Sequence, residues 1–288
     1  MTQTVKTITD KLCQYLSMKG ITNSKLETDL ILTKALNCNR IQLYCSYDYP
    51  LNNIELQVIR QLARRRARHE PMAYILGEKE FRSMSYYIDR RVLIPRPETE
   101  LVIELLERYY YNEKYHTAVD IGTGSGILAI NCSILFKSAL VIATDISYDA
   151  LEVALINIKK HRIQNVRLLM CNKLQCIKDN SVELVISNPP YIRTYDLDEL
   201  SYEIKSYEPR IALDGGQDGM IKIREILTDA TRVCSIKGII IIEIGKGQRC
   251  LVEEWVNESR LPLKLDRVGK DLVGIDRVLC YRKEECNG

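Results

Sequence analysis

Ala118-Val119-Asp120-Ile121-Gly122-Thr123-Gly124-Ser125-Gly126 is the stretch that decides the fold. Its first residues have the character of a short, largely apolar strand, and the glycines that follow allow the backbone to turn and to approach a ligand closely. The apolar residues up to Phe136 then predict a helix whose N-terminal amide groups face the same ligand. The stretch is therefore typical of the first strand, turn and helix of an α/β sheet.

Strands and helices are predicted to alternate on the C-terminal side of this stretch. The apolar runs that predict strands lie at residues 118–121, 139–145, 166–170, 182–186 and 238–244. The helical patterns between them lie at residues 124–136, 148–160 and 220–233. Near-continuous apolar strands joined by helices indicate a parallel sheet covered on both faces. After a helix near residues 251–259, residues 263–268 and 275–281 predict an antiparallel pair joined through Gly269 and Gly274.

Residues 1–75 show only helical periodicity. Helices are predicted from Val5 to a C-cap at Gly20, from Ser24 through Leu36 to near Asn39, and from Asn53 to Glu70-Pro71. Ser24 and Glu27 have the spacing of a capping box, and Pro71 prevents the third helix from continuing. Residues 72–95 alternate around Gly77 and predict a short hairpin. We therefore predict a helical domain over residues 1–75, a hairpin linker over residues 76–95 and an α/β domain over residues 96–288.

The composition predicts a chain with a sizeable core and no strong overall charge. The 288 residues are 46% hydrophobic, and 41 basic against 38 acidic residues leave a net charge of +3. This balance does not predict bulk binding to nucleic acid. No apolar run reaches the ~18 residues that span a bilayer, and the first residues lack a secretory signal pattern, so we expect a cytoplasmic protein without membrane contact.

The cysteines and histidines offer no pattern of metal ligands. The ten cysteines are scattered without a C-x-x-C pair, and the three histidines have no zinc-ligand spacing. We therefore predict reduced thiols, mostly small core residues, and no metal site.

The third predicted helix ends in the basic run Arg64-Arg65-Arg66-Ala67-Arg68-His69. Cations at a helix C-terminus complement its partial negative charge, so a solvated helix end explains the run. A contact for an acidic partner or for an RNA backbone is the alternative interpretation. Both interpretations stay open at this point.

Two acidic residues suggest which ligand the glycine turn receives. Asp145 follows the second strand about 20 residues beyond the turn, where a carboxylate can accept hydrogen bonds from both hydroxyls of a ribose. The glycine pattern of dinucleotide-binding enzymes, G-x-G-x-x-G or G-x-G-x-x-A, does not match when it starts at Gly122, because Ile127 stands at the position of the third glycine. It does match when it starts at Gly124. Asp120 favours a cationic amino group, such as that of S-adenosylmethionine, because its carboxylate would repel a pyrophosphate.

The apolar run at residues 182–186 leads into Asn188-Pro189-Pro190-Tyr191. The prolines stiffen the loop and donate no backbone hydrogen bond. Asn188 Oδ1 and the Pro189 carbonyl would then accept the two hydrogens of a planar NH2 group, and Tyr191 would cover its flat face. Because ligands of open parallel sheets lie at the carboxyl ends of strands, we expect this loop and the glycine turn to share one cleft.

Further motifs give the chain a close resemblance to release factor glutamine methyltransferases, the HemK/PrmC family. The segments that carry it, besides the loop and the turn, are Glu70-Pro71, Tyr74-Ile75, Gly77, Pro95-Arg96-Pro97-Glu98-Thr99-Glu100, residues 207–216, Glu243-Ile244-Gly245, Lys270-Asp271-Leu272 and Asp276-Arg277-Val278. Matching residues cover almost everything from 70 to 282.

The resemblance implies a Rossmann-like methyltransferase sheet and a methyl transfer from S-adenosylmethionine, which leaves S-adenosylhomocysteine. The acceptor would be the side-chain amide of the glutamine in the Gly-Gly-Gln loop of class I peptide chain release factors. Asp120, residues 122–126, Asp145 and Asn188 would then hold the cofactor, residues 188–191 the glutamine, and the helical domain would help to dock the release factor.

The chain departs from the family after the third strand of the sheet. An acidic residue followed by an aromatic one usually lies there near adenine, whereas this chain has Asn172-Lys173. Asn172 can still bond to an adenine amine, and Lys173 would cover the ring with its aliphatic stem.

Other functions remain possible from the sequence alone. A methyltransferase acting on adenine in DNA or RNA, or on a glutamine of a ribosomal protein, would use the same loop; a dinucleotide oxidoreductase or a nucleotide sensor would use only the turn. Gly215-Gly216-Gln217 repeats the substrate tripeptide within the enzyme. A polar turn explains this repeat, and self-methylation of Gln217 is the alternative.

Overall fold

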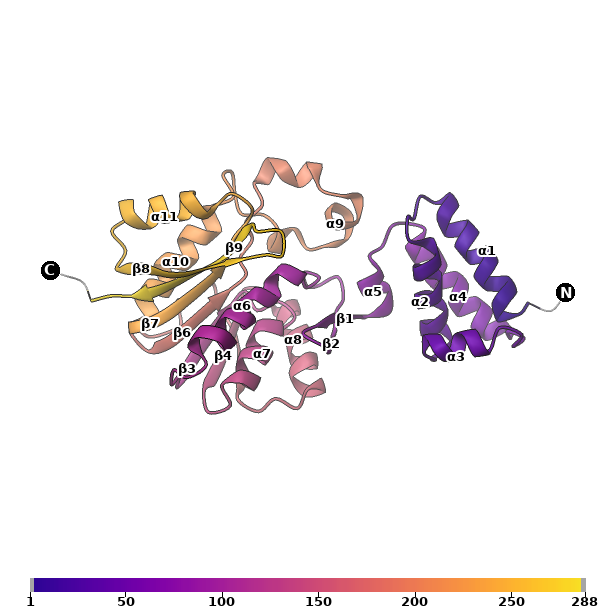
Figure 1. Ribbon diagram of the computed structural model, residues 1–288, viewed down its shortest axis with the longest axis horizontal. Helices are drawn as coiled ribbons and strands as arrows, with labels where there is room; N and C mark the ends of the chain where they lie inside the picture. Colours follow the sequence, from indigo (N-terminus) through magenta and orange to yellow (C-terminus); the bar gives the residue numbers. More distant parts are fainter. Residues whose placement is uncertain (1–2, 286–288) are drawn as a thin grey trace. The chain divides into compact units, whose positions relative to one another are not determined.

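The computed structural model describes residues 3–285, which form two compact units (Figure 1). The first, the helical unit, comprises the residues up to Glu78 together with Ser201–Tyr207. The second, the sheet unit, comprises Lys79–Leu200 and the residues from Glu208 onward. The chain thus leaves the sheet unit after Leu200, contributes a short segment to the helical unit and returns at Glu208. The role of residues 76–95 as a linker stays a prediction.

The helical unit contains α1 (Val5–Met18), α2 (Ser24–Leu36), α3 (Arg40–Cys45), α4 (Asn53–Arg66), α5 (Met72–Leu76) and α9 (Tyr202–Tyr207). Its core consists of apolar residues from the first helices, such as Val5, Leu16, Ile31 and Leu43. The sequence did not reveal α3 and α5, which have 6 and 5 residues, because so short a helix shows no repeat of apolar residues. Gly77, with φ of +73°, ends α5 and does not lie in the hairpin.

The predicted capping box at Ser24 is wrong. The N-cap of α2 is Asn23, and its side chain makes no capping hydrogen bond. Capping boxes occur instead at Thr4 in α1, at Asn39 in α3 and at Asn52 in α4.

Two arginines of the basic run are occupied inside the helical unit. Arg66 is buried and pairs with Glu27 of α2 and with Glu203 of α9, the latter at 2.8 Å. Arg65 Nη2 lies 2.8 Å from Glu70 Oε1 and also donates to a backbone carbonyl of α5. Both side chains therefore tie α4 to its neighbours, which leaves Arg64 and Arg68 as the arginines of the run that remain for a partner.

The sheet unit is built on a seven-stranded sheet in the order β5-β4-β3-β6-β7-β9-β8. Its strands are β3 (Thr117–Ile121), β4 (Leu140–Asp145), β5 (Val166–Met170), β6 (Val182–Ser187), β7 (Cys234–Glu243), β8 (Leu263–Lys270) and β9 (Asp276–Lys283). β3 to β7 are parallel, and β9 pairs antiparallel with both β7 and β8. The predicted parallel sheet with an antiparallel C-terminal hairpin is confirmed, although Gly269 lies within β8 rather than in the turn.

Helices pack against this sheet as expected for a parallel α/β fold (Figure 1). They are α6 (Glu100–Leu105), α7 (Ile127–Leu135), α8 (Tyr148–Lys160), α10 (Ile221–Val233) and α11 (Arg249–Glu258). Short 3-10 turns cover Pro97–Thr99, Thr194–Glu199 and Arg210–Ala212, a π-helical turn continues α6 over Leu106–Tyr110, and β1 (Glu78–Phe81) and β2 (Met84–Tyr87) form a separate hairpin.

The strand order places a topological switch point between β3 and β6. From β3 the chain builds β4 and β5 on one side of the sheet and then crosses to β6 and β7 on the other. Ligands of open α/β sheets lie outside the carboxyl ends of the strands at such a point. The glycine turn after β3 and the Asn188 loop after β6 flank this position. Among residues 3–285 no helix is long and apolar enough to cross a membrane.

Candidate active site

The glycine turn after β3 has a backbone that only glycine adopts easily. Gly122, Gly124 and Gly126 have φ values of +69°, +54° and +82°, in the region where a Cβ atom is unfavourable. The Thr123 amide donates to the Thr144 carbonyl at 2.9 Å and the Gly124 amide donates to Asp145 Oδ2 at 2.9 Å. The turn is therefore held against the end of β4, next to Asp145, the residue that is predicted to bind the ribose.

Asp120 lies under the turn and is fully buried. Its Oδ2 accepts from the Thr123 hydroxyl at 2.7 Å and from the Ala129 amide at 3.1 Å, whereas Oδ1 has no hydrogen-bond partner among the described residues. Burial raises the pKa of Asp120 to about 7, although the contacts with Thr123 and Ala129 oppose the rise. A cationic group next to Oδ1 would satisfy this oxygen and stabilise the ionised form.

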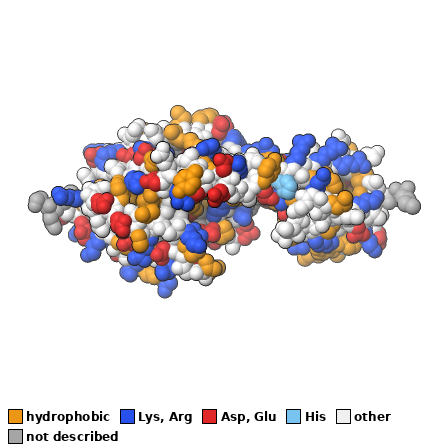
Figure 2. Space-filling view, turned by 90° about the horizontal axis from the view of Figure 1, so that it is seen from above, with side chains coloured by type: hydrophobic (Ala, Val, Ile, Leu, Met, Phe, Trp, Pro, Cys, Tyr) orange, Lys and Arg blue, Asp and Glu red, His pale blue; other side chains and the backbone are white. Residues whose placement is uncertain are grey.

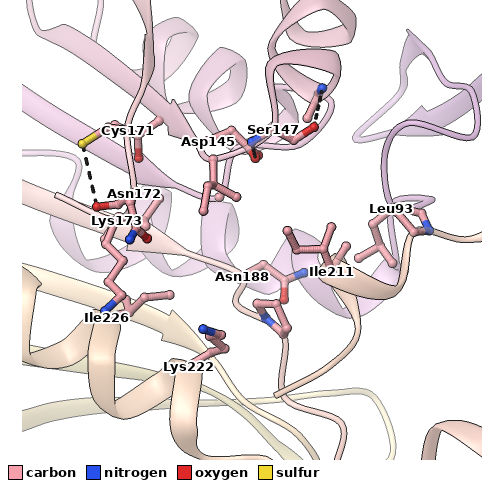
Figure 3. Close-up of a pocket in the computed structure, with 18 of the residues that line it drawn as sticks. Leu93, Asp145, Ser147, Cys171, Asn172, Lys173, Asn188, Ile211, Lys222 and Ile226 are labelled. Atoms are coloured by element: carbon pink, nitrogen blue, oxygen red, sulfur yellow. Dashed lines mark hydrogen bonds between the residues drawn. The ribbon is translucent and has the colours of Figure 1, made fainter. Parts of the chain in front are cut away.

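Asp145 ends β4 and faces a cavity of ≈ 970 Å³, a volume that includes its open mouth (Figure 3). Its Oδ1 accepts from the Ser147 amide at 2.9 Å, and Oδ2 accepts from Gly124. Burial raises the pKa of the Asp145 carboxyl, and these backbone amides oppose the rise. Because a carboxylate oxygen has two lone pairs, each oxygen can accept a further hydrogen bond from the cavity.

The cavity brings together six of the predicted site residues. Gly122, Asp145, Asn172, Lys173, Asn188 and Pro190 line it. The predicted site residues that do not line the cavity are Asp120, residues 123–126, Pro189 and Tyr191. The glycine turn and the Asn188 loop therefore flank one cleft, while the roles of the individual residues stay predictions.

Asn188 is oriented by a residue far from it in the sequence. Its Nδ2 donates to Thr99 Oγ1 at 2.9 Å. Because the amide nitrogen is engaged in this bond, Oδ1 is the Asn188 atom left to accept a hydrogen bond from a ligand. Thr99 itself is buried, at 1% exposure, at the end of the 3-10 turn that precedes α6.

Tyr191 packs behind the loop. Its ring lies against the core cluster of the sheet, and its hydroxyl donates to Glu243 Oε1 at 3.3 Å. Burial raises the pKa of Tyr191, so the hydroxyl keeps its proton at neutral pH. Its predicted role in covering the substrate amide is not tested by this arrangement.

The Asn188 loop is backed by two further segments. The Ile192 amide donates to the Leu213 carbonyl at 3.1 Å, and the Gly215 amide donates to the Ile192 carbonyl at 2.8 Å. Gln248, which is buried, donates through Nε2 to the Tyr191 carbonyl at 3.0 Å. Proline stiffness is therefore supplemented by bonds that fix the loop from behind.

Lys173 reaches across the cavity wall to α10. Its Nζ lies 3.3 Å from Glu225 Oε2, and Lys222 binds the same carboxylate at 3.1 Å. All three residues line the cavity, and the stem of Lys173 extends from the β5 end toward Ile226 (Figure 3). The Lys173 side chain is therefore held along the cavity wall by Glu225, while its predicted role in covering adenine stays a prediction.

Several site residues were not predicted as such. Thr99 and Glu243 lie in the segments 95–100 and 243–245, and Pro209 and Ile211 of the cavity wall lie in the segment 207–216. The resemblance singled out these segments without assigning roles to them. Nothing in the sequence marked Lys222, Glu225 and Ile226 of α10 as residues of the site, because their spacing is that of any helix face.

Arg96 and Glu208 also belong to these segments, and in the structure they form an ion pair with each other. Arg96 Nη2 lies 2.6 Å from Glu208 Oε1, and Glu208 Oε2 accepts from the Ile94 amide at 3.1 Å. This buried carboxylate fixes the segment that presents Thr99.

The fold and this site define a Rossmann-like, S-adenosylmethionine-dependent methyltransferase. A solved methyltransferase from Pyrococcus furiosus has the same fold, with a TM-score of 0.55 and 19% identity over 77% of this chain and 100% of that one. The release factor glutamine methyltransferase of Geobacter sulfurreducens is 38% identical to this chain over 85% of each protein. That of Rhodopirellula baltica is 33% identical over 97% of this chain and 96% of the relative. The chain belongs to the release factor glutamine methyltransferase family.

Two family profiles match the chain, and the first of them supports this assignment. The profile described as "PrmC N-terminal domain" matches residues 8–77, which lie in the helical unit. The profile described as "Ribosomal protein L11 methyltransferase (PrmA)" matches residues 96–204, which span the glycine turn and the Asn188 loop. The resemblance inferred from the sequence is thus confirmed.

Proposed function

We propose that this enzyme transfers a methyl group from S-adenosylmethionine to the side-chain amide nitrogen of the glutamine in the Gly-Gly-Gln loop of class I release factors. The observation that carries the proposal is the bond from Asn188 Nδ2 to Thr99, which leaves Asn188 Oδ1 as an acceptor in the cavity that Gly122 and Asp145 also line. The curated relatives support it. Release factors act in the cytoplasm, so this location is part of the proposal.

The residues present fit S-adenosylmethionine. The carboxylate of Asp145 suits its ribose, and Asn172 and Lys173 suit its adenine, because these three residues line the cavity. Asp120 does not line it, but its buried and unpartnered Oδ1 would favour a cationic amino group from beneath the glycine turn. When bound, the cofactor supplies an electrophilic methyl group on a positively charged sulfur.

The Asn188 loop can activate an amide without a general base. An amide nitrogen is a poor nucleophile because its lone pair is delocalised into the carbonyl. Asn188 Oδ1 and the Pro189 carbonyl would each accept one hydrogen of the NH2 group, hold its plane and favour the positive charge that develops on nitrogen. Pro190 and Tyr191 would keep water from this position.

Replacing Asp145 by alanine is expected to raise the dissociation constant for S-adenosylmethionine by about tenfold or more, because a charged acceptor for the ribose is lost. Isothermal titration calorimetry with the purified full chain checks this, and circular dichroism confirms that the variant is folded. Asp149 is exposed at the start of α8 and provides the control, since its replacement by alanine removes one carboxylate outside the cavity. An unchanged affinity in the folded Asp145 variant would contradict the assignment.

Incubation with methyl-labelled S-adenosylmethionine tests the function itself. The acceptors are a class I release factor, the same factor with Gly-Gly-Gln changed to Gly-Gly-Ala, ribosomal protein and DNA. Label on the native factor alone, located on the glutamine by mass spectrometry, supports the proposal. Label on ribosomal protein or on DNA, with none on the release factor, selects one of the alternatives instead.

The helical unit offers a basic surface for docking. Arg60, Arg64 and Arg68 follow one another at four-residue spacing along α4 and its end and line a polar hollow with Arg65. Figure 2 shows basic side chains gathered on the helical unit. Next to them an apolar groove between α1 and α4 is bordered by Lys11, Arg60 and Arg64. We propose that this surface contacts an acidic part of the release factor.

Changing Arg60, Arg64 and Arg68 together to glutamate is expected to weaken release-factor binding by about tenfold at low salt and to flatten its salt dependence, because steering charges are reversed. The control changes Lys6, Lys25 and Lys34 of the same unit to glutamate, with an equal change in net charge. Affinities are measured at several ionic strengths. If both triple variants weaken binding equally, the basic surface has no specific role in docking. The basic run is then explained as a solvated helix end.

A further inference from the structure

The carboxylate of Glu225 in the cavity wall is only half used by its neighbours. Glu225 lies on α10 and lines the cavity together with Asn172 and Lys173, which follow β5. Its Oε2 lies 3.3 Å from Lys173 Nζ and 3.1 Å from Lys222 Nζ. Its Oε1 accepts no hydrogen bond from any residue between 3 and 285. One oxygen of a carboxylate that borders the cavity is therefore left for a ligand.

The charge of Glu225 decides what kind of ligand group this oxygen can bind. Burial acts to raise the pKa of Glu225, but its bonds with Lys222 and Lys173 outweigh burial and lower the pKa below that of an ordinary glutamate. The side chain is 33% exposed, so it is not closed off from the cavity. An ionised carboxylate carries no proton, and Oε1 can therefore only accept a hydrogen bond.

Asn172 offers a less selective group at the same end of the cavity. Within the described part of the chain its backbone oxygen accepts from Cys171 Sγ at 3.8 Å, and its side chain makes no hydrogen bond. Nothing in the protein therefore fixes which atom of its amide faces the cavity. Because an amide has both a donor and an acceptor, it can satisfy an amine or a carbonyl alike. Selection of an amine therefore needs the acceptor of Glu225.

The base of a bound nucleoside would lie in this part of the cavity. The Cys171 amide donates to the Asp145 carbonyl at 3.0 Å, so the loop after β5 begins beside the predicted ribose site. Asn172 and Lys173 of this loop line the cavity (Figure 3). Ile146 lines it as well and is 54% exposed, which provides an apolar surface for a flat ring. A base joined to a ribose at Asp145 would thus be directed toward the end of the cavity that the β5 loop forms.

We propose that Glu225 selects the base of the cofactor, because its free Oε1 accepts a hydrogen bond from the exocyclic amine of adenine. The inference rests on the proposed function, in which the cavity binds S-adenosylmethionine. The two lysines hold the carboxylate through Oε2, so little side-chain freedom is lost when Oε1 binds the amine. A base without the amine would leave this charged oxygen unpaired, at a cost in affinity.

The test is a double-mutant cycle that removes the amine from the ligand and the carboxylate from the enzyme. The probes are S-adenosylhomocysteine and its analogue with an unsubstituted purine, which lacks only the amine. Isothermal titration calorimetry with the full-length chain gives both dissociation constants. The wild-type chain is expected to bind the adenine probe about tenfold more tightly than the purine probe. In Glu225→Ala this ratio is expected to fall to within about twofold.

Two further variants test whether the effect belongs to Glu225. Asp229→Ala removes a carboxylate from the same helix, outside the cavity, and Asn172→Ala removes the other polar side chain near the base. Both are expected to keep the tenfold ratio, whatever affinity they lose for the two probes together. A ratio that is lost in Asn172→Ala overturns the role of Glu225, and this comparison also decides the question if circular dichroism shows that Glu225→Ala is unfolded.

The wild-type measurements separate this role from the proposed function. A wild-type ratio near one overturns the role of Glu225 and leaves the methyl transfer untouched. A wild-type chain that binds neither probe overturns the cofactor assignment and the role of Glu225 together. A chain that shows the tenfold ratio, and loses it in Glu225→Ala, supports the role of Glu225 even if no release factor is methylated, in which case only the proposed acceptor is wrong.

Discussion

Replacing Asn188 by alanine is expected to lower the turnover number for release-factor methylation by about a thousandfold, while the dissociation constant for S-adenosylmethionine stays within about twofold. The side chain provides one of the two proposed acceptors for the amide hydrogens, and the Thr99 bond at 2.9 Å leaves its Oδ1 as the free acceptor. Loss of Oδ1 leaves the NH2 group unoriented at the moment when charge develops on nitrogen. The other residues proposed to hold the cofactor, such as Gly122 and Asp145, lie on other elements, so we expect the cofactor affinity to be largely preserved.

Two further variants sharpen this measurement. The Asn188→Asp side chain keeps an acceptor oxygen but cannot donate a hydrogen bond to Thr99. We expect this variant to lose most of its activity, because the acceptor oxygen is no longer held in one orientation. Asn112, an exposed asparagine outside the cavity, provides a control in which the same amide is removed without effect. Single-turnover rates and cofactor titrations are compared for all three. Equal losses of turnover and of cofactor affinity in Asn188→Ala would contradict the role in amide activation.

The sheet was predictable because each of its strands carries its own signal. β3, β6 and the last part of β7 are buried, so their sequences are nearly continuous apolar runs, whereas the edge strand β5 is partly exposed. The change of pattern after residue 260 revealed the antiparallel hairpin. The helical unit was less predictable. Its shortest helices have no period to detect, and the capping residue of α2 depends on backbone geometry that Ser24 and Glu27 do not determine.

The site shows which contacts a sequence can reveal. Gly122, Asp145 and Asn188 follow strands directly, so the parallel topology alone placed them at one edge of the sheet. Thr99 lies 89 residues from Asn188 in the sequence, and no local pattern connects the two. The inward role of Arg66 was equally hidden, because its partners Glu27 and Glu203 belong to α2 and α9. A run of four arginines therefore resembled a single binding surface, although only Arg64 and Arg68 of the run are exposed.

The internal Gly-Gly-Gln sequence has a packing explanation. An added Cβ at Gly215 would lie 2.8 Å from Tyr191 Cα and 2.9 Å from the Pro190 carbonyl oxygen, and one at Gly216 would meet the side chain of Ile221. Gln217 is exposed and is not among the residues that line the cavity. The two glycines therefore allow this turn to lie against the Asn188 loop, and no likeness to the substrate is needed to account for them.

Replacing Gly215 by alanine is expected to lower turnover by about a hundredfold, because the atoms that the new methyl group meets belong to the backbone and cannot rotate away. Besides Tyr191 and Pro190, it would lie 2.8 Å from the Gly219 carbonyl oxygen. Overpacking of this kind costs about 1–3 kcal/mol and displaces the backbone. Here the displaced backbone is the loop that carries Asn188, so a shift of a fraction of an ångström reaches the reacting amide.

The matched control separates this displacement from a general loss of stability. Gly274 lies in the turn between β8 and β9 with φ of +83°, and an added Cβ there would meet nothing within 4 Å. Gly274→Ala is therefore expected to cost about 1 kcal/mol of folding free energy through its backbone conformation alone. Thermal unfolding and kcat are measured for both variants well below their midpoints. If Gly215 positions the Asn188 loop, both variants are less stable but only Gly215→Ala loses turnover. Normal turnover in a folded Gly215→Ala enzyme would show that the loop tolerates the shift. Amide activation would then not depend on a rigid Asn188 loop.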